Sequence, residues 1–280
     1  MPHHELPGAA IFHELAGEGR PALVFIHGGG CDHGDWHAQV GALAGDFTVL
    51  TLDLRGHGRS TGMVEDCTVE RWAADVNALT ETLGIGPAVM VGHSLGSRVA
   101  AEAAFQQPDN AAALVLLDGS RSVGGFAASA PATDAPAALG GQSLAAVIAA
   151  TIGPYADEST RRRVTETMTA ASLDLLRQTV AAYTAWDTDR ADAVFAALPG
   201  DLPVLAIQST YHDNFTPRRS LSAGDTTPYL EFLKRALPQL EVMILPKTGH
   251  FAMMERSGEV NAAIRAIAGH TGQDNERERR

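Results

Sequence analysis

Positive charge is scarce in this 280-residue sequence. It has 21 lysine and arginine residues against 33 aspartate and glutamate residues, which gives a formal net charge of −12 at pH 7. Nucleic acids and anionic membranes are bound through clustered positive charge, so this balance argues against both as partners. The composition indicates no other macromolecular partner and leaves the oligomeric state open.

Cysteine and long apolar runs are also nearly absent. Cys31 and Cys67 stand alone, in neither a Cys-x-x-Cys nor a metal-ligand spacing, and we interpret both as reduced thiols. The histidines follow no familiar ligand spacing, so we predict no metal site and no cofactor. No apolar run approaches the ~20 residues that cross a bilayer, and the first residues do not resemble a signal peptide. We therefore expect a cytoplasmic protein.

The sequence does contain the pattern of an α/β fold. Short apolar runs alternate with helical patterns, and their continuous hydrophobicity is typical of strands buried on both faces of a mostly parallel sheet. The runs expected to form strands are residues 10–15, 21–27, 47–52, 89–91, 113–117, 203–208 and 240–245. Strands that alternate with helices in this way predict a central sheet flanked by helices.

The alternation stops between two of these strands. Residues 119–200 contain no strand-like run, only a linker rich in small residues and then four helical patterns, at 143–152, 157–170, 172–186 and 189–198. An insertion of this length predicts a helical cap over the carboxyl ends of the strands. We therefore expect a core of residues 1–119 and 201–270, a cap of residues 120–200, and a disordered tail of residues 271–280.

A serine lies where an apolar strand meets an alanine-rich helical pattern. The motif Gly92-His93-Ser94-Leu95-Gly96 has the Gly-x-Ser-x-Gly form of a tight strand-to-helix turn that exposes the serine hydroxyl. The helix that follows would direct its unpaired N–H groups and positive dipole end at developing negative charge. Ser94 is therefore the candidate nucleophile.

Four landmarks in order resemble the α/β-hydrolase superfamily, in particular its serine esterases and lactonases with a helical cap. They are His27-Gly28-Gly29, the segment from Asp53 to Ser60, the Ser94 motif and Gly249-His250. The resemblance implies an α/β-hydrolase fold with Ser94 as nucleophile and His250 as general base. It also implies an oxyanion hole formed by the backbone N–H groups of Gly29 and Leu95.

The resemblance leaves two positions open for the acid of the triad. Most relatives carry it after the next-to-last strand, which points to Asp213, whereas a minority carry it after the strand that follows the nucleophile helix. There Asp118 stands directly at a predicted strand end. The segment Ser209-Thr210-Tyr211-His212 departs from the usual late-acid pattern, so we favour Asp118 and keep Asp213 as the alternate acid.

These residues together predict a serine hydrolase for a small carboxylic ester or lactone. We expect Trp186, Tyr211 and Phe251 to contribute to an apolar substrate pocket. The same triad would also serve a C–C bond hydrolase or a perhydrolase, and the same fold could act as a ligand receptor with little turnover. The sequence alone does not separate these alternatives.

Overall fold

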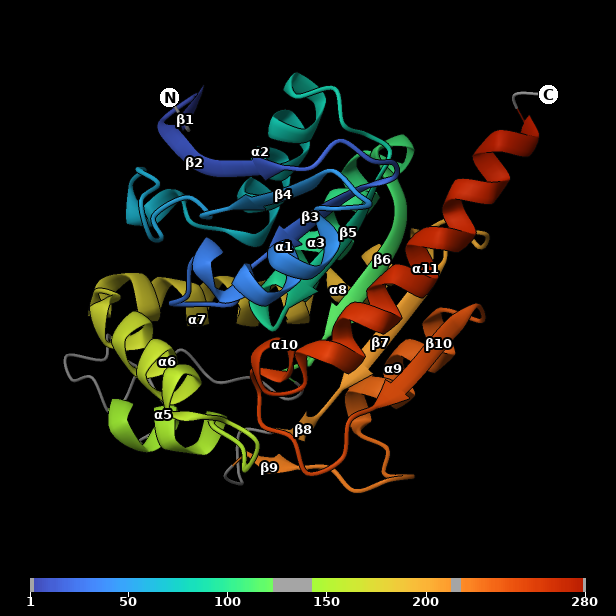
Figure 1. Ribbon diagram of the computed structural model, residues 1–280. Helices are drawn as coiled ribbons and strands as arrows, with labels where there is room; N and C mark the ends of the chain where they lie inside the picture. Colours follow the sequence, from blue (N-terminus) through green and yellow to red (C-terminus); the bar gives the residue numbers. More distant parts are fainter. Residues whose placement is uncertain (1–2, 123–142, 213–217, 279–280) are drawn as a thin grey trace.

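The centre of the molecule is an eight-stranded sheet (Figure 1). The computed structural model describes residues 3–122, 143–212 and 218–278, with side chains as far as Thr271. The strand order is β1-β2-β4-β3-β5-β6-β7-β10, and every pair from β4 to β10 is parallel, whereas β1 and β2 add antiparallel at one edge. The strands are β1 (His3–Leu6), β2 (Ala9–Ala16), β3 (Ala22–Ile26), β4 (Val49–Leu52), β5 (Ala88–His93), β6 (Ala111–Leu117), β7 (Val204–Gln208) and β10 (Leu240–Ile244).

The continuous apolar runs form strands because both faces of the sheet are covered. In β3 every residue is buried, and its side chains alternate between two hydrophobic cores. Val24 and Ile26 belong to the core that also contains α2 and α3, whereas Leu23 and Phe25 belong to the core that contains α1 and α11. The period-2 alternation of a strand thus supplies both cores. The mostly parallel sheet expected from the sequence is confirmed.

Helices cover the two faces of the sheet in separate layers (Figure 1). One layer comprises α2 (Val69–Thr82), α3 (Leu95–Gln106) and α9 (Pro228–Ala236). The other comprises α1 (His37–Leu43), α10 (Ala252–Glu255) and α11 (Ser257–Glu278). The α2 helix begins after Thr68, whose hydroxyl caps the helix by accepting a hydrogen bond from the Arg71 N–H.

Within residues 143–203, which the structure describes between β6 and β7, four helices lie close to the positions expected from the sequence. They are α5 (Leu144–Thr151), α6 (Glu158–Ala170), α7 (Leu173–Asp189) and α8 (Ala191–Ala197). We call them the helical insertion; residues 143–203 contain no strand. Side chains of α7 pack against the loop after β3, since Leu176 and Thr179 are the nearest neighbours of Gly30 and Gly29. The insertion therefore lies over the ends of the central strands (Figure 1).

The C-terminal helix extends beyond the end expected from the sequence. We expected a disordered tail of residues 271–280, whereas α11 continues to Glu278. The segment contains no proline, and its glutamate and arginine residues favour a helix. Although α11 has 22 residues, it is too polar to cross a membrane, and no other helix in the described ranges meets the requirement.

Candidate active site

Ser94 occupies a strained backbone conformation between β5 and α3. Its φ of 54° and ψ of −111° place a non-glycine residue in the left-handed half of the Ramachandran map. Its N–H donates to the Leu117 carbonyl at 2.9 Å, which ties the turn to the end of β6. The side chains on either side, His93 and Leu95, are buried, whereas Ser94 is only half-buried. The turn therefore leaves the serine partly accessible.

The glycines of the motif are required by close backbone contacts. A Cβ atom at Gly92 would collide with the carbonyl oxygen of Gly96, and one at Gly96 would collide with that of Ile26. Ser97 is fully buried, and its hydroxyl donates to the Gly92 carbonyl at 2.8 Å. The strand and helix can therefore pack closely only with glycine at both positions.

His250 and Asp118 form a direct contact, although 132 residues separate them in the chain. The distance between His250 Nδ1 and Asp118 Oδ2 is 2.6 Å. Asp118 immediately follows β6 and also has a positive φ of 45°. Its carboxylate accepts further hydrogen bonds from the N–H groups of Ser209 and Thr210, at 2.8 and 2.7 Å, and from the Thr210 hydroxyl at 2.6 Å. These bonds fix the carboxylate against the histidine.

The surroundings of this pair shift both pKa values downward. Burial alone would raise the pKa of Asp118, but the hydrogen bond and charge of His250, followed by the Arg218 charge, hold it at about 2. Burial lowers the pKa of His250 to about 4, and the neighbouring Arg218 guanidinium acts in the same direction against the raising effect of Asp118. At neutral pH the pair is therefore a carboxylate beside a neutral imidazole.

Arg218 is the member of this cluster that the sequence did not single out. Its Nη1 lies 2.7 Å from Thr210 Oγ1, 3.1 Å from His250 Nδ1 and 3.5 Å from Asp118 Oδ2. Since the Nδ1 proton of His250 is donated to Asp118, the contact between Arg218 and His250 is mainly electrostatic. Arg218 just precedes the short strand β9 (Arg219–Ser220), which pairs with β8 (Thr210–Tyr211). This ribbon brings the cation to the pair.

The loop after β3 brings a second set of backbone N–H groups to Ser94. A Cβ at Gly28 would lie 3.4 Å from the Cβ of Ser94, so this loop runs directly beside the serine. Among the residues described, neither the Gly29 N–H nor the Leu95 N–H has a hydrogen-bond partner. His27 supports the loop, since its Nε2 accepts the Leu54 N–H at 2.9 Å. Two unsatisfied donors thus lie in the loops that flank Ser94.

Two buried aromatic residues pack against His250. The ring centroid of His93 lies 4.5 Å from that of His250, and the His93 Nε2 is 3.0 Å from the His250 carbonyl oxygen. Phe251 is 2% exposed, and its ring centroid lies 5.6 Å from that of His250 and 5.1 Å from that of His93. We expected Phe251 to contact substrate, whereas the structure places it against the two histidines.

The other residues expected in the substrate pocket lie in different environments. Trp186 is 2% exposed, and its indole N–H donates to Glu102 at 2.8 Å in the core between α7 and α3. This contact gives Trp186 a packing role between α7 and α3, and its contact with substrate stays a prediction. Tyr211 is half-buried and lines a cavity with Arg218. Asp213, the alternate acid, lies outside the described residues.

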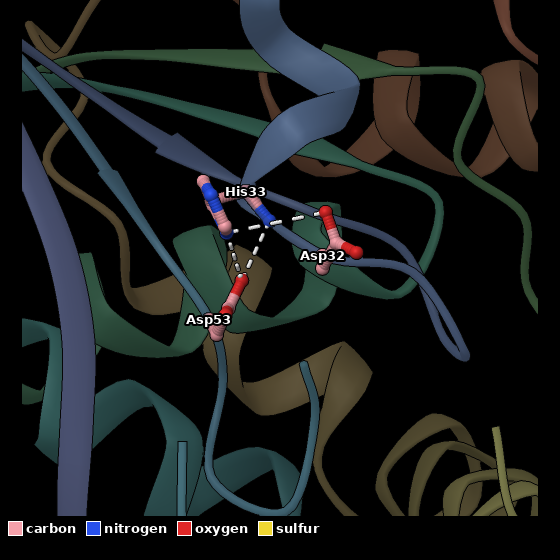
Figure 2. Close-up of side chains that lie close together, drawn as sticks. All are labelled: Asp32, His33 and Asp53. Carbon is pink, nitrogen blue, oxygen red and sulfur yellow. Dashed lines mark hydrogen bonds and ion pairs between the residues drawn. The ribbon is translucent and has the colours of Figure 1, made fainter. Parts of the chain in front are cut away.

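A separate group of acidic and histidine side chains joins the loop before α1, which carries Asp32 and His33, to Asp53 in the loop after β4 (Figure 2). Asp53 Oδ1 accepts hydrogen bonds from both the N–H and the Nδ1 of His33 at 2.7 Å, and its Oδ2 accepts the Arg59 N–H at 2.7 Å. Asp32 accepts the Gly34 N–H at 2.8 Å and pairs with Arg163 of α6. Protein donors thus occupy Asp32 Oδ1 and both oxygens of Asp53, and the group joins the loops after β3 and β4 to α6.

The comparison with family models agrees with this geometry. A model described as "Alpha/beta hydrolase family" matches residues 23–263. The chain belongs to the alpha/beta hydrolase family. The match includes the Ser94 turn, Asp118 and the His250 loop.

Curated relatives of this alpha/beta hydrolase have several different names. It is 29% identical over 269 residues to the dihydrolipoyllysine-residue acetyltransferase component of the acetoin cleaving system of Pseudomonas putida, a match of 91% of this chain and 65% of that protein. It is 40% identical over 83 residues to 3-oxoadipate enol-lactonase 1 of Acinetobacter baylyi, a match of 30% of this chain and 31% of that protein. The chain thus spans less than two thirds of the length of these relatives.

Solved structures share the fold at low sequence identity. The enol-lactonase of Burkholderia xenovorans LB400 has a TM-score of 0.76 and 20% identity, covering 95% of this chain and 99% of that one. A thermophilic esterase of Thermogutta terrifontis has a TM-score of 0.73 and 24% identity, covering 96% of this chain and 97% of that one. At these identities the likeness establishes the fold of this alpha/beta hydrolase.

Proposed function

We propose that this alpha/beta hydrolase cleaves a carboxylic ester or lactone through an acyl-enzyme on Ser94. The observation that carries the proposal is the 2.6 Å contact between His250 Nδ1 and Asp118 Oδ2, located beside the strained Ser94 turn. The enol-lactonase and esterase names among the structural neighbours support the same reaction class.

The first step is attack of the Ser94 hydroxyl on the substrate carbonyl carbon. A serine hydroxyl needs a base to accept its proton, and in this proposal the base is Nε2 of the neutral His250 imidazole. Asp118 accepts the Nδ1 hydrogen, which selects the tautomer with a free Nε2 lone pair and stabilises the imidazolium that forms. The 2.6 Å contact supports this assignment of acid and base.

The tetrahedral intermediate carries a negative oxygen that the backbone stabilises. The N–H groups of Gly29 and Leu95 are the proposed donors, because both lie beside Ser94 without a partner among the residues described. The intermediate collapses when the C–O bond breaks and His250 returns the proton to the leaving oxygen. In a lactone that oxygen remains attached to the acyl group.

Water completes the cycle by hydrolysing the acyl-enzyme. His250 accepts a proton from the water as it attacks the acyl carbon, and then protonates Ser94 as the second C–O bond breaks. The helical insertion acts in this proposal as the cap over the reacting groups, since Thr179 and Leu176 pack onto the loop that carries Gly29. The products are a carboxylic acid and an alcohol, or a hydroxy acid from a lactone.

Hydrolysis of p-nitrophenyl butyrate at pH 7 tests the proposal. We expect the wild-type protein to release nitrophenolate, and Ser94→Ala to lose at least ~10³-fold of the rate while staying folded by circular dichroism. Ser159→Ala, on the exposed surface of α6, is the matched control and should retain full activity. A folded Ser94→Ala protein with the wild-type rate would contradict the proposal, and tight ligand binding without turnover would favour a receptor.

A further inference from the structure

A cavity of about 200 Å³ lies beside the Asp118–His250 pair. Its walls come from the loop after β6, from α7, from the β8–β9 ribbon and from the start of α9. Its lining includes Arg121, Tyr183, Gln208, Thr210, Arg218 and Tyr229. Two of these side chains are arginines, and none of those described is a carboxylate.

The two arginines differ in how far their charge is already neutralised. Arg121 forms an ion pair with Asp192 and also donates to the Asp187 carbonyl oxygen at 3.3 Å. Arg218 is 13% exposed, and the carboxylate within ion-pair distance among the described residues is Asp118, at 3.5 Å. That carboxylate already accepts four closer hydrogen bonds. The cavity wall therefore contains the buried positive charge of Arg218, which is only partly neutralised.

Two tyrosine hydroxyls of the wall can also donate hydrogen bonds to a ligand. The phenol groups of Tyr183 and Tyr229 line the cavity, and burial raises both pKa values, so both remain hydrogen-bond donors at neutral pH. Gln208 is 2% exposed, and its Oε1 has no hydrogen-bond partner among the residues described. This acceptor could pair only with a hydroxyl or N–H group of a ligand, so it takes no part in binding a carboxylate.

The cavity is close enough to the reacting groups to hold another part of the same substrate. Thr179 and Tyr183 are four residues apart on α7, so they lie on one face of the helix about 6 Å apart along its axis. Thr179 packs at Gly29, whereas Tyr183 lines the cavity. One face of α7 therefore contacts both the loop that carries Gly29 and the cavity whose wall contains Arg218.

We propose that this cavity binds a carboxylate group of the substrate, so that the preferred substrates are esters or lactones whose acyl part carries a second carboxylate. The proposal rests on the proposed function for the position of the scissile bond. A guanidinium can bind a carboxylate through two parallel hydrogen bonds, and charge-assisted bonds of this kind are stronger than neutral ones. Arg218 is then a specificity-determining residue.

A matched pair of esters tests this preference. Mono-p-nitrophenyl glutarate carries the second carboxylate, whereas p-nitrophenyl valerate has the same chain length without it. We expect wild-type kcat/KM to be higher for the glutarate ester by about 10- to 100-fold, the usual effect of a charge-assisted hydrogen bond. Arg218→Met should remove most of this ratio, and Arg218→Lys should restore part of it.

The control variant is Arg235→Met, which removes one exposed positive charge from the last turn of α9. It should leave the ratio of the two kcat/KM values unchanged. Arg218 also contacts the Asp118–His250 pair, so Arg218→Met is expected to alter both rates; the ratio is therefore the diagnostic quantity. The proposal would be overturned if the wild type had nearly equal kcat/KM values for the two esters and Arg218→Met lowered both values equally. The proposed function would then remain intact.

A binding experiment separates failure of the site from failure of the reaction. Glutarate is titrated calorimetrically into Ser94→Ala and into the double variant Ser94→Ala/Arg218→Met. Binding to the first protein and at least tenfold weaker binding to the second would support the carboxylate site, even if neither ester were hydrolysed. Hydrolysis of neither ester would contradict the proposed function, whereas glutarate that binds neither protein would overturn the carboxylate site.

Discussion

The strained residues of this molecule gather at the proposed active site. Among the residues described, three that are not glycine have a positive φ: Ser94, Asp118 and Lys247. They lie in the loops after β5, β6 and β10, and the last of these loops also carries His250. Such conformations cost about 1–3 kcal/mol each and persist only where the surrounding structure holds them. Here tight glycine contacts and the hydrogen bonds to Asp118 provide that support.

Replacing the carboxylate of Asp118 should reduce turnover without loss of the fold. Asp118→Asn keeps the shape but presents an amide to His250, which favours the wrong tautomer, so we expect kcat to fall by about 10⁴-fold. The matched variant Asp213→Asn should change kcat by less than about tenfold. Initial rates with p-nitrophenyl butyrate measure both. The reverse pattern would assign the acid to Asp213.

The pH dependence of activity should reflect the lowered pKa of His250. Burial and the Arg218 charge hold this pKa at about 4, so the imidazole is a neutral base at every pH above that value. We therefore expect the acid limb of kcat/KM to have its midpoint near pH 4, below the value of 6.5 for an ordinary histidine. Arg218→Met should raise the midpoint. A wild-type midpoint at or above 6.5 would contradict this account.

Some of these residues could be predicted from the sequence, and others could not. Ser94, Asp118 and His250 stand at the ends of apolar runs, and the ends of parallel strands meet at one edge of a sheet. Arg218 has no such signal, because a loop arginine looks the same whether it faces solvent or a buried carboxylate. Trp186 was assigned to the pocket from residue type alone, and only the structure shows its bond to Glu102.

Helix α7 is fixed to the core by a buried ion pair. Arg98 of α3 and Asp187 of α7 form two hydrogen bonds, at 2.8 and 2.7 Å, and their side chains are 5% and 1% exposed. Asp187 also accepts the Ser122 N–H at 2.7 Å. At the other side of the insertion, the Thr151 carbonyl oxygen accepts the His250 N–H at 2.7 Å. The insertion thus supports the loop that carries the proposed base.

Removing one partner of this ion pair should destabilise the protein strongly. Arg98→Met leaves the Asp187 carboxylate buried without its counter-charge, which typically costs 3–5 kcal/mol, so we expect a loss of about that size in the free energy of unfolding. Urea titration followed by circular dichroism measures it. The double variant Arg98→Met/Asp187→Leu removes both charges and should recover part of the loss. A loss below about 1 kcal/mol for Arg98→Met would contradict this role.

Elements with strong patterns were predictable, and short polar ones were not. The buried strands and the helices of the insertion follow from apolar runs, helical periodicity and capping residues such as Ser143, Asp157 and Ser172. The strands β1, β8 and β9 were missed because they are two to four residues long and largely polar. These three strands exist because each forms hydrogen bonds with an adjacent strand, and such pairing cannot be recognised from a sequence pattern.

Across the whole molecule, buried histidines should make the fold sensitive to acid. Four histidines are at most 6% exposed, and burial is the main cause of a lowered pKa in each: His27, His57, His93 and His250. The unfolded chain binds protons at these positions below pH 6.5, whereas the folded chain remains neutral there to a lower pH, because burial lowers all four pKa values, to about 4 for His250 and about 3 for His57. Stability present above pH 6.5 is therefore lost as the pH falls, by about 1.4 kcal/mol per pH unit for each such histidine.

Carboxyl groups with a raised pKa act in the opposite direction. Burial raises the pKa of Asp35 to about 6, and it also raises those of Asp75 and Glu255. As the pH falls, these carboxyl groups take up protons in the folded protein at a higher pH than in the unfolded chain. They therefore offset part of the stability that is lost through the buried histidines. We expect the histidines to dominate, with a clear decrease in the free energy of unfolding between pH 7 and pH 5. Urea titrations at several pH values measure it, and a constant or increasing stability would refute the expectation.

The order of motifs along the chain predicted the overall architecture of the molecule, but it did not predict the order of strands in the sheet. Alternating strands and helices with the Ser94 turn in the middle indicated a mostly parallel sheet, which the structure confirms. The placement of β4 between β2 and β3 does not follow from periodicity, because apolar runs do not specify their neighbours. It depends on crossover connections and on packing in both cores.

Covalent trapping of Ser94 is the most direct test of the central claim. A fluorophosphonate reacts with an activated serine, forming an oxygen–phosphorus bond with loss of fluoride. We predict one added group per chain, located by mass spectrometry on the peptide that contains Ser94, and no labelling of the folded Ser94→Ala protein or of heat-denatured wild type. Labelling of another serine, or no labelling of a folded wild-type protein, would contradict the account.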